Sequence, residues 1–467
     1  MKMFHHRHGR VLWLWVVLFG GLIPLPARAD LFEYVKKNDG KYSWKLKEKI
    51  KTDQGTIYDL HLVSQIWHDI TWEHQLQVYQ PKDVEPNATM LIYNTGGTAN
   101  PGNIAFGMIL AQKTKTPVAF LYGIPNQPLL GDKKEDALIA ETFVRYLDTK
   151  DDTWPLLFPM VKSVVKAMDA LQEFSKEEWK KPVEKFVLSG ASKRGWTTWL
   201  TGAVDPRLKA IAPLVIDTLN MHKQMAHQKE SFGEYSEMIH DYTERGLVPM
   251  PKGEEPKKLW MMVDPYFYRD KITMPKLLIN GNNDPYWTTD ALNLYWDDLK
   301  GDKYVAYIAN AGHNLQQTDD KGKEIDRLKA VDTLAAFARA EITDKPLPKV
   351  TWKHDGANGK LRLNVDADPA PTGARLWVAT APTRDFRKAR WNEQRVDLAK
   401  NKIVGDVNAP AKGCLAFYAE LDYEIDGIKY HLCTQIRIAG EAKKSGERKE
   451  KKDGERDDGK GAGDSQD

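Results

Sequence analysis

Residues 185–200, KFVLSGASKRGWTTWL, decide how this chain folds. The run begins as a buried strand at Phe186–Leu188 and ends in a helical pattern, so a strand passes directly into a helix. The turn between them is GASKRG, residues 190–195, with Ser192 near its centre. A serine in such a position is either a nucleophile on a strand-to-helix elbow or a member of an ordinary tight turn.

Short apolar runs of the same kind recur along the chain, and helical patterns lie between them. The six runs lie in residues 88–97, 116–125, 183–190, 208–216, 274–285 and 303–313. Strands alternating with helices predict a parallel sheet that is covered on both faces. Two stretches with alternating polarity, Thr56–Trp67 and Thr71–Tyr79, precede the first run and predict antiparallel strands at the sheet edge. The fold class is therefore α/β.

The pattern changes twice, which divides the chain into domains. Residues 30–346 form the α/β unit, and residues 220–270 interrupt it with a segment rich in Met, His, Tyr and Glu. We expect this insertion to be a helical lid over the top edge of the sheet. After a proline-marked linker, residues 347–440 alternate like a β-sandwich. Residues 441–467 are charged and lack aromatic side chains, which predicts disorder.

The first 29 residues resemble a secretory signal peptide. A basic start precedes an apolar run, Val11–Ile23, and Ala27-Arg28-Ala29 fits a cleavage site. The run is shorter than the ~20 apolar residues that a spanning helix needs. We expect export to the periplasm or the cell exterior, with no stable membrane insertion after cleavage.

Composition limits the partners of the chain. The formal net charge is +3, with 42% hydrophobic and 28% charged residues, which is typical of a globular protein and gives no basis for binding nucleic acid. The sequence does not define an oligomeric state.

The two cysteines, Cys414 and Cys433, lie in a predicted hairpin that turns at Asp426-Gly427. A continuous register places Cys433 opposite Glu420, and Cys414 opposite Ala439. The two sulfurs would then be too far apart for a disulfide. Either both thiols are free or the register differs.

Three residues with the chemistry of a serine hydrolase follow the apolar runs in the order Ser, Asp, His. Ser192 ends the third run, Asp284 the fifth and His313 the sixth. The carboxyl ends of parallel strands meet at one edge of a sheet, where α/β-hydrolases place such a triad. Asp217, which follows the fourth run, is the second candidate for the acid. Asp284 can also be explained as a helix cap.

The chemistry requires each of these residue types. A serine hydroxyl needs a neutral imidazole to take its proton, and the imidazole needs a carboxylate to fix its tautomer. The oxyanion needs donors, for which we propose the N–H of Lys193 and the loop that contains Gly97 and Thr98. The elbow departs from G-x-S-x-G because Arg194 occupies the second position after the serine. We expect Gly195 to relieve the crowding one residue later.

Several stretches together give a family resemblance. They are SGASKRGWTTW, DPRLKAIAPLVIDTLN, DPYFYRDKITMPKLLINGNNDPYW, NAGHNL and ATAPTRDFRKARW. The chain resembles the PhoPQ-activated pathogenicity-related protein family, which also contains the autocrine proliferation repressor proteins, over about residues 30–440. This resemblance implies an α/β-hydrolase fold and places the family's Ser, Asp and His on Ser192, Asp284 and His313. The natural substrate of the family is not settled.

Residues near the elbow are candidates for substrate binding. Arg194, Trp196 and Trp287 are predicted to lie near the cleft, although Lys193 and Arg194 can also be a solvated pair. We expect a small-molecule or peptide substrate and no cofactor. The lid histidines show no ligand spacing for a metal; they are His222, His227 and His240.

Two questions stay open in the sequence. The first is whether the chain is an enzyme acting on an ester or amide, or a non-catalytic binding or signalling protein on the same scaffold. The second concerns the basic stretch that contains Arg384, Arg387, Lys388 and Arg390. It is either a solvated strand edge or a segment that packs on the hydrolase unit and braces the lid or the cleft rim.

Overall fold

The computed structural model describes residues 31–441, and a nine-stranded sheet forms the centre of this part of the chain. The predicted signal peptide and the predicted charged tail, except for Glu441, lie outside the described residues. The strands are β1 (Ser43–Thr52), β2 (Gly55–Trp67), β3 (Ile70–Pro81), β4 (Thr89–Asn94), β5 (Val118–Leu121), β6 (Lys185–Ala191), β7 (Leu208–Leu214), β8 (Lys276–Gly281) and β9 (Lys303–Ile308).

The spatial order of these strands is β1-β2-β3-β5-β4-β6-β7-β8-β9. Strands β1 to β3 pair antiparallel and β3 meets β5 antiparallel, whereas β4 to β9 are parallel to one another. A mostly parallel sheet with a crossover at β5-β4, an antiparallel edge and helices on both faces is the α/β-hydrolase arrangement. The predicted fold class is confirmed.

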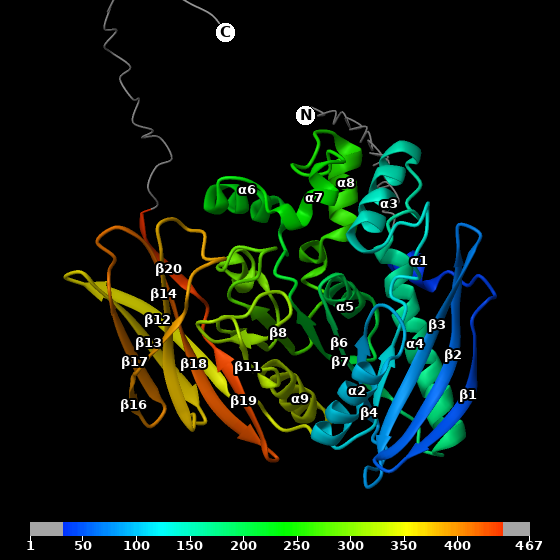
Figure 1. Ribbon diagram of the computed structural model, residues 1–467. Helices are drawn as coiled ribbons and strands as arrows, with labels where there is room; N and C mark the ends of the chain where they lie inside the picture. The colour runs from blue at the N-terminus through cyan, green and yellow to red at the C-terminus, as the bar shows by residue number, and fades with distance from the viewer. Residues whose placement is uncertain (1–30, 442–467) are drawn as a thin grey trace, which may run out of the picture.

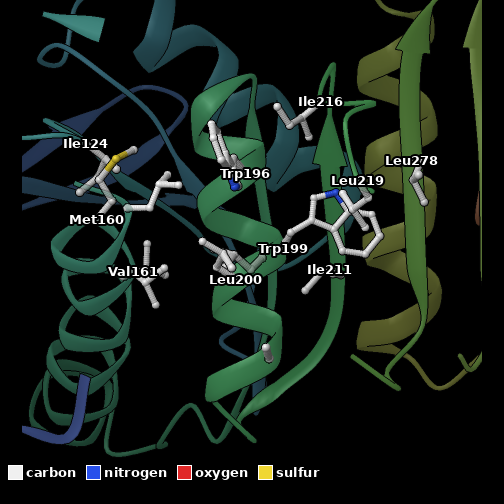
Figure 2. Close-up of a cluster of buried hydrophobic side chains, with 14 of the residues drawn as sticks. Ile124, Met160, Val161, Trp196, Trp199, Leu200, Ile211, Ile216, Leu219 and Leu278 are labelled. Carbon is white, nitrogen blue, oxygen red and sulfur yellow. The ribbon is translucent and has the colours of Figure 1, made fainter. Parts of the chain in front are cut away.

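Alternate residues of each central strand enter different cores. In β6, Leu188 belongs to the core under α4 and α5, and Val187 to the core under α2 and α9. The helices around the sheet are α1 (Leu31–Lys36), α2 (Pro101–Thr114), α3 (Glu135–Thr149), α4 (Leu157–Glu178), α5 (Lys193–Val204) and α9 (Lys329–Ile342). Figure 2 shows Trp199 and Leu200 of α5 among buried side chains of α4 and β7, including Val161 and Ile211. Two well-filled cores therefore hold the strand ends in place.

The segment between β7 and β8 forms a helical lid, here defined as residues 221–268. It contains α6 (Met221–Phe232), α7 (His240–Thr243), α8 (Glu254–Val263) and two 3₁₀ turns, Glu237–Ile239 and Pro265–Tyr268. These helices lie beyond the carboxyl ends of the parallel strands, at the top of Figure 1. The buried carboxylate of Asp264 accepts hydrogen bonds from the backbone N–H of Met221 at 2.8 Å and of Tyr266 at 2.9 Å. One side chain thereby joins the beginning and the end of the lid.

The chain between β8 and α9 also contains short elements. They are the 3₁₀ turns Ala291–Leu294 and Trp296–Asp298, and the small hairpin of β10 (Gln317–Thr318) and β11 (Glu324–Asp326). None of the helices within residues 31–441 is both long and apolar enough to span a bilayer.

Residues 349–441 form two further sheets that pack face to face. One contains β12 (Lys349–Ala357), β13 (Lys360–Asp368), β17 (Lys402–Asn408) and β16 (Asp397–Ala399), and the other contains β15 (Asn392–Gln394), β14 (Gly373–Ala381), β18 (Gly413–Ile425), β19 (Ile428–Cys433) and β20 (Arg437–Glu441). Val365 and Ile403 of the first sheet share a buried core with Leu376 and Phe417 of the second. This arrangement is a β-sandwich.

The sandwich covers the β9 edge of the central sheet. The backbone N–H of Tyr307 in β9 donates to the Sγ of Cys433 at 3.3 Å, and the Nε2 of His431 lies 3.2 Å from the Tyr307 carbonyl oxygen. Side chains of β19 thus form hydrogen bonds with backbone groups of β9. These groups would have no protein partner if β9 were an exposed edge strand. Figure 1 shows the sandwich beside the sheet, next to β8, β11 and α9.

Both cysteines are free and buried, and the register around one of them differs from the prediction. Cys433 does pair with Glu420, but Cys414 lies opposite Gly440 rather than Ala439. The second strand of the hairpin breaks after Cys433, where the N–H and hydroxyl of Thr434 bond to the backbone of Ala419. The break adds one residue before β20 begins, so the later register shifts by one.

A buried ion cluster joins the sandwich to α9. Glu420 of β18 is fully buried, and it pairs with Lys329 of α9 at 2.8 Å and with Arg375 of β14. Burial alone would raise the pKa of Glu420, but its neighbours His431, Lys329 and Arg375 outweigh burial and lower the pKa to about 2. The carboxylate is therefore ionised throughout the physiological range.

We expect Glu420→Gln to lower the free energy of unfolding by about 3 kcal/mol at pH 7, because the change leaves two half-buried cations without the charge of their shared partner. The folded-state pKa of Glu420 is depressed to about 2. The stabilisation that ionised Glu420 gives to the fold is therefore complete at pH values above the pKa of this group in the unfolded chain. It fades as the pH falls towards 2. Urea unfolding between pH 7 and pH 3 should show the difference from wild type shrinking on acidification.

Glu424→Gln is the matched control, because Glu424 lies on the same strand and is exposed. This variant should stay within about 0.5 kcal/mol of wild type. Equal losses in the two variants would show that the Glu420 cluster does not stabilise the fold.

Candidate active site

Ser192 lies on a strained turn between β6 and α5. Its backbone angles are φ 58° and ψ −127°, a region that a residue with a Cβ rarely occupies. The Ser192 N–H donates to the carbonyl of Leu214 at 2.9 Å, and its carbonyl accepts from the N–H of Trp196 at 2.9 Å. The turn is therefore fixed by bonds to the neighbouring strand and to the first turn of the helix.

Two glycines allow this turn, as the sequence predicts. A Cβ on Gly190 would lie well under 3.0 Å from the amide nitrogen of Asn94 and 2.9 Å from the Arg194 carbonyl oxygen. A Cβ on Gly195 would lie 2.7 Å from a methyl of Ile216 and 3.0 Å from the Gly190 carbonyl oxygen. The small residue needed after the serine is thus Gly195, one position later than in G-x-S-x-G.

Asp284 and His313 meet beyond the ends of β8 and β9. The Oδ2 of Asp284 lies 2.8 Å from the Nδ1 of His313, and its Oδ1 accepts the N–H of Tyr286 at 2.9 Å. An ionised carboxylate only accepts hydrogen bonds, so Nδ1 carries the hydrogen of a neutral imidazole. The Nε2 then has a free lone pair and can take a proton.

The second candidate acid, Asp217, makes different contacts. It accepts a hydrogen bond from the hydroxyl of Tyr295 at 2.5 Å and from the amide of Asn280 at 3.1 Å. Burial raises its pKa to about 7. Asp217 lies in the core, and Asp284 is the carboxylate that bonds His313.

Ser192 and His313 line different cavities. Ser192 lines a cavity of about 360 Å³ beneath the lid, which we call the chamber. His313 is 27% exposed and lines a cavity of about 760 Å³ at the surface, which we call the hollow. Tyr286 links the two parts of the site, because it lines the chamber and its ring centroid lies 4.3 Å from that of His313. Among residues 31–441, no hydrogen bond joins the Ser192 hydroxyl to His313.

Aromatic and methionine side chains form about half of the chamber wall, and ligand cavities are commonly lined in this way. They come from α5, from the lid and from the loop after β8. The members are Trp196, Met221, Met225, Tyr235, Tyr242, Met250, Trp260, Met261, Tyr266, Phe267, Tyr286 and Trp287. The predicted binding residues Trp196 and Trp287 therefore lie in one cavity with Ser192.

Only one of the three predicted oxyanion donors lies in the chamber wall. Lys193 begins α5 and lines the chamber, and N–H groups in the first turn of a helix have no acceptor within that helix. Gly97 and Thr98 are exposed and are not part of the chamber wall. Lys193 is thus the one of the three that lies beside Ser192 in the chamber.

Arg194, which the sequence suggests as a substrate-binding residue, is not part of the chamber wall and already has partners. Its guanidinium forms a two-pronged ion pair with Glu135, at 2.6 and 2.7 Å, and donates to the carbonyl oxygen of Ile124. It also lies against Gly96, where a Cβ would collide with it. Arg194 is therefore occupied in holding the loops after β4 and β5 against the elbow.

Glu135 is a residue that the sequence analysis missed. It also pairs with the side chain of Lys193 at 3.0 Å. Burial alone would raise its pKa, but Arg194 and Lys193 lower the pKa to about 2. Glu135 lies 58 residues before Lys193 and 59 before Arg194 in the sequence, so no local pattern could indicate the contact.

One group within residues 31–441 has metal-ligand chemistry, namely Glu420, His431 and Cys433. The Glu420 carboxylate already pairs with Lys329, and the Nδ1 of His431 lies 3.1 Å from the hydroxyl of Thr333. The ammonium group of Lys329 neutralises the charge that would attract a metal cation. These contacts explain the cluster as an ion pair network.

A loop of the sandwich holds the acid and histidine loops. We call residues 383–391, between β14 and β15, the bridging segment. The amide of Asn283 donates to its carbonyl oxygens at Phe386 and Ala389, at 3.0 and 2.7 Å. Asn310 bonds both backbone groups of Trp391, at 2.8 and 2.9 Å. Asn283 precedes Asp284 directly and Asn310 lies three residues before His313, so the segment fixes both loops.

The bridging segment also reaches the lid. Arg384 pairs with Asp290 at 2.5 Å, and Asp290 pairs in turn with His227 of α6 at 2.7 Å. The guanidinium carbon of Arg387 lies 3.9 Å from the ring centroid of Phe232 at the end of α6. Of the two explanations for the basic stretch, the structure therefore supports packing against the hydrolase unit and the lid.

Comparisons with known proteins are consistent with this architecture. Residues 31–387 match the family described as PhoPQ-activated pathogenicity-related protein. Autocrine proliferation repressor protein A of Dictyostelium discoideum is 34% identical over 448 residues, which cover 88% of this chain and 89% of the relative.

Solved structures give weaker matches. Acetyl xylan esterase 1 from Thermoanaerobacterium sp. JW/SL YS485 is 14% identical with a TM-score of 0.45, covering 67% of this chain and 91% of the esterase. The acylaminoacyl peptidase of Pyrococcus horikoshii is 14% identical with a TM-score of 0.41, covering 65% of this chain and 50% of the peptidase.

The acid and histidine loops approach each other at two glycines, which gives a test of this part of the site. We expect Gly281→Ala to lower the free energy of unfolding by about 2 kcal/mol, because its Cβ would lie well under 3.0 Å from the carbonyl oxygens of Ala311 and Gly312. Gly312→Ala is the control, since its Cβ would meet only the Asn283 carbonyl oxygen, at 3.8 Å. Urea unfolding measures both, and a tolerated Gly281→Ala would refute the close approach.

Proposed function

This chain belongs to the PhoPQ-activated pathogenicity-related protein family, and we propose that it is an exported serine hydrolase that cleaves an ester or amide. Ser192 is the nucleophile, His313 the general base and acid, and Asp284 the residue that orients His313. The leader-like sequence of residues 1–29 supports a periplasmic or secreted location.

The strained backbone of Ser192 carries the proposal. A φ of 58° with a ψ of −127° is unfavourable for serine, and glycine would adopt it more easily. A serine held there by Gly190 and Gly195 gains no packing, because its side chain lines the chamber wall. Exposure of a nucleophilic hydroxyl at the end of a central strand explains the arrangement.

The proposed reaction has two halves. The Ser192 oxygen attacks the substrate carbonyl, and its proton passes to the Nε2 of His313, which Asp284 holds through Nδ1. The Lys193 N–H, at the start of α5, stabilises the negative oxygen. His313 then protonates the departing alcohol or amine, and water releases the acyl group by the same steps in reverse.

A non-catalytic signalling role is the second candidate. It is supported by the name of the Dictyostelium discoideum relative, a proliferation repressor. The two candidates differ in one property, because a signalling protein does not need a reactive Ser192.

Reaction with a fluorophosphonate probe tests the proposal. We expect the folded protein to be labelled at Ser192, and Ser192→Ala to lose the label completely. Asp284→Asn should lower the labelling rate by about 10⁴-fold, because the imidazole would adopt the wrong tautomer. Mass spectrometry of the labelled peptide identifies the site, and thermal unfolding checks that each variant is folded.

Ser189→Ala is the matched control. Ser189 lies three residues earlier on β6, is buried and donates to the Ala212 carbonyl oxygen. This variant should label like wild type. A folded wild-type protein that does not react at Ser192 would leave the signalling role as the better explanation.

A further inference from the structure

The chamber and the hollow differ in chemistry as well as in position. The chamber that Ser192 lines also presents Met221 and Met225 of α6, Trp196 of α5 and Trp260 of α8. These side chains are apolar or aromatic, and they make the space beneath the lid suited to a hydrocarbon group.

Three of the four carboxylate and ammonium groups at the chamber wall have partners, and the fourth, Lys257, belongs to an exposed residue. Lys193 pairs with Asp136 at 3.1 Å, and both residues line the chamber. The Asp264 carboxylate accepts backbone N–H groups at both ends of the lid. The wall thus holds few free charges that would favour an ionic group over an apolar one.

The hollow beside His313 is polar. Its wall includes Asn314, Gln316, Asp319 and Lys388. Lys388 is exposed, and the amide of Asn314 bonds Gln316 at the surface. A polar group that leaves through this space stays close to the imidazole and can exchange its contacts with water.

We propose that the substrate carries a large apolar acyl group, which fills the chamber, and a polar leaving group, which departs through the hollow. The inference rests on the proposed function. The Ser192 oxygen forms a bond to the acyl carbon as the bond to the leaving group breaks. The proton lost by Ser192 passes through His313 to that leaving group, so atoms and charge balance.

Two esters with exchanged halves test the proposal directly. Monooctanoyl glycerol has an apolar acyl group and a polar alcohol, whereas octyl acetate has a small acyl group and an apolar alcohol. Each methylene buried in the chamber should raise kcat/KM about twofold to fourfold. We therefore expect kcat/KM for monooctanoyl glycerol to exceed that for octyl acetate by about 100-fold or more.

A variant that fills the chamber locates the effect. Met225→Trp, on the chamber wall, should lower the ratio of kcat/KM for octanoyl over acetyl esters of p-nitrophenol at least about 10-fold, because the larger ring fills the space for the acyl chain. Met238→Trp is the control, because Met238 lies in the lid, is 38% exposed and is not part of the chamber wall. It should keep the full preference.

The outcomes separate the two proposals. An equal or higher rate with octyl acetate, abolished by Ser192→Ala, overturns the acyl-group inference and leaves the hydrolase intact. If neither ester is cleaved, phosphonofluoridates that carry a methyl or an octyl group on phosphorus replace them. Faster labelling of Ser192 by the octyl compound supports the inference, and equal labelling overturns it. No labelling by either compound overturns the hydrolase proposal itself.

Discussion

The close approach of β6 and α5 is the constraint on which the rest of the site depends. Neither Gly190 nor Gly195 has room for a Cβ, so strand and helix pack almost backbone to backbone around Ser192. The bond from Ser192 to Leu214 adds the neighbouring strand to this arrangement. With the elbow fixed, the helix buries Trp199 and Leu200 against α4 and β7, and the lid covers Ser192 at the cavity wall.

The fold was largely predictable because strands that are buried on both faces need continuous apolar runs. All six runs form the parallel strands β4 to β9. The edge strand β1 was missed, since only Trp44, Leu46 and Ile50 interrupt its lysines and polar residues. The strands β15 and β16 were missed because each has only three residues, all exposed. The strand β17 was missed as well, although its alternate residues are buried.

For the site, the sequence could indicate positions at strand ends but not the directions of side chains. Asp284 and His313 meet because the ends of β8 and β9 are adjacent. The ion pair of Arg194 was not predicted, because its partner Glu135 begins α3 and a pair so far apart in the sequence leaves no periodic signal. The chamber wall is equally non-local, since most of it comes from the lid.

The bridging segment is synthesised after the loops that it holds, so the site can take its final geometry only late in synthesis. Domains fold as units while the chain is made, at about 5–20 residues per second, and N-terminal parts fold first. Ser192, Asp284 and His313 all emerge before residues 383–391, which hold the loops of the last two. A chain cut short ahead of Trp391 contains every reactive group of the site but lacks these bonds to two of its loops. The correct geometry of the site therefore depends on synthesis having passed Trp391.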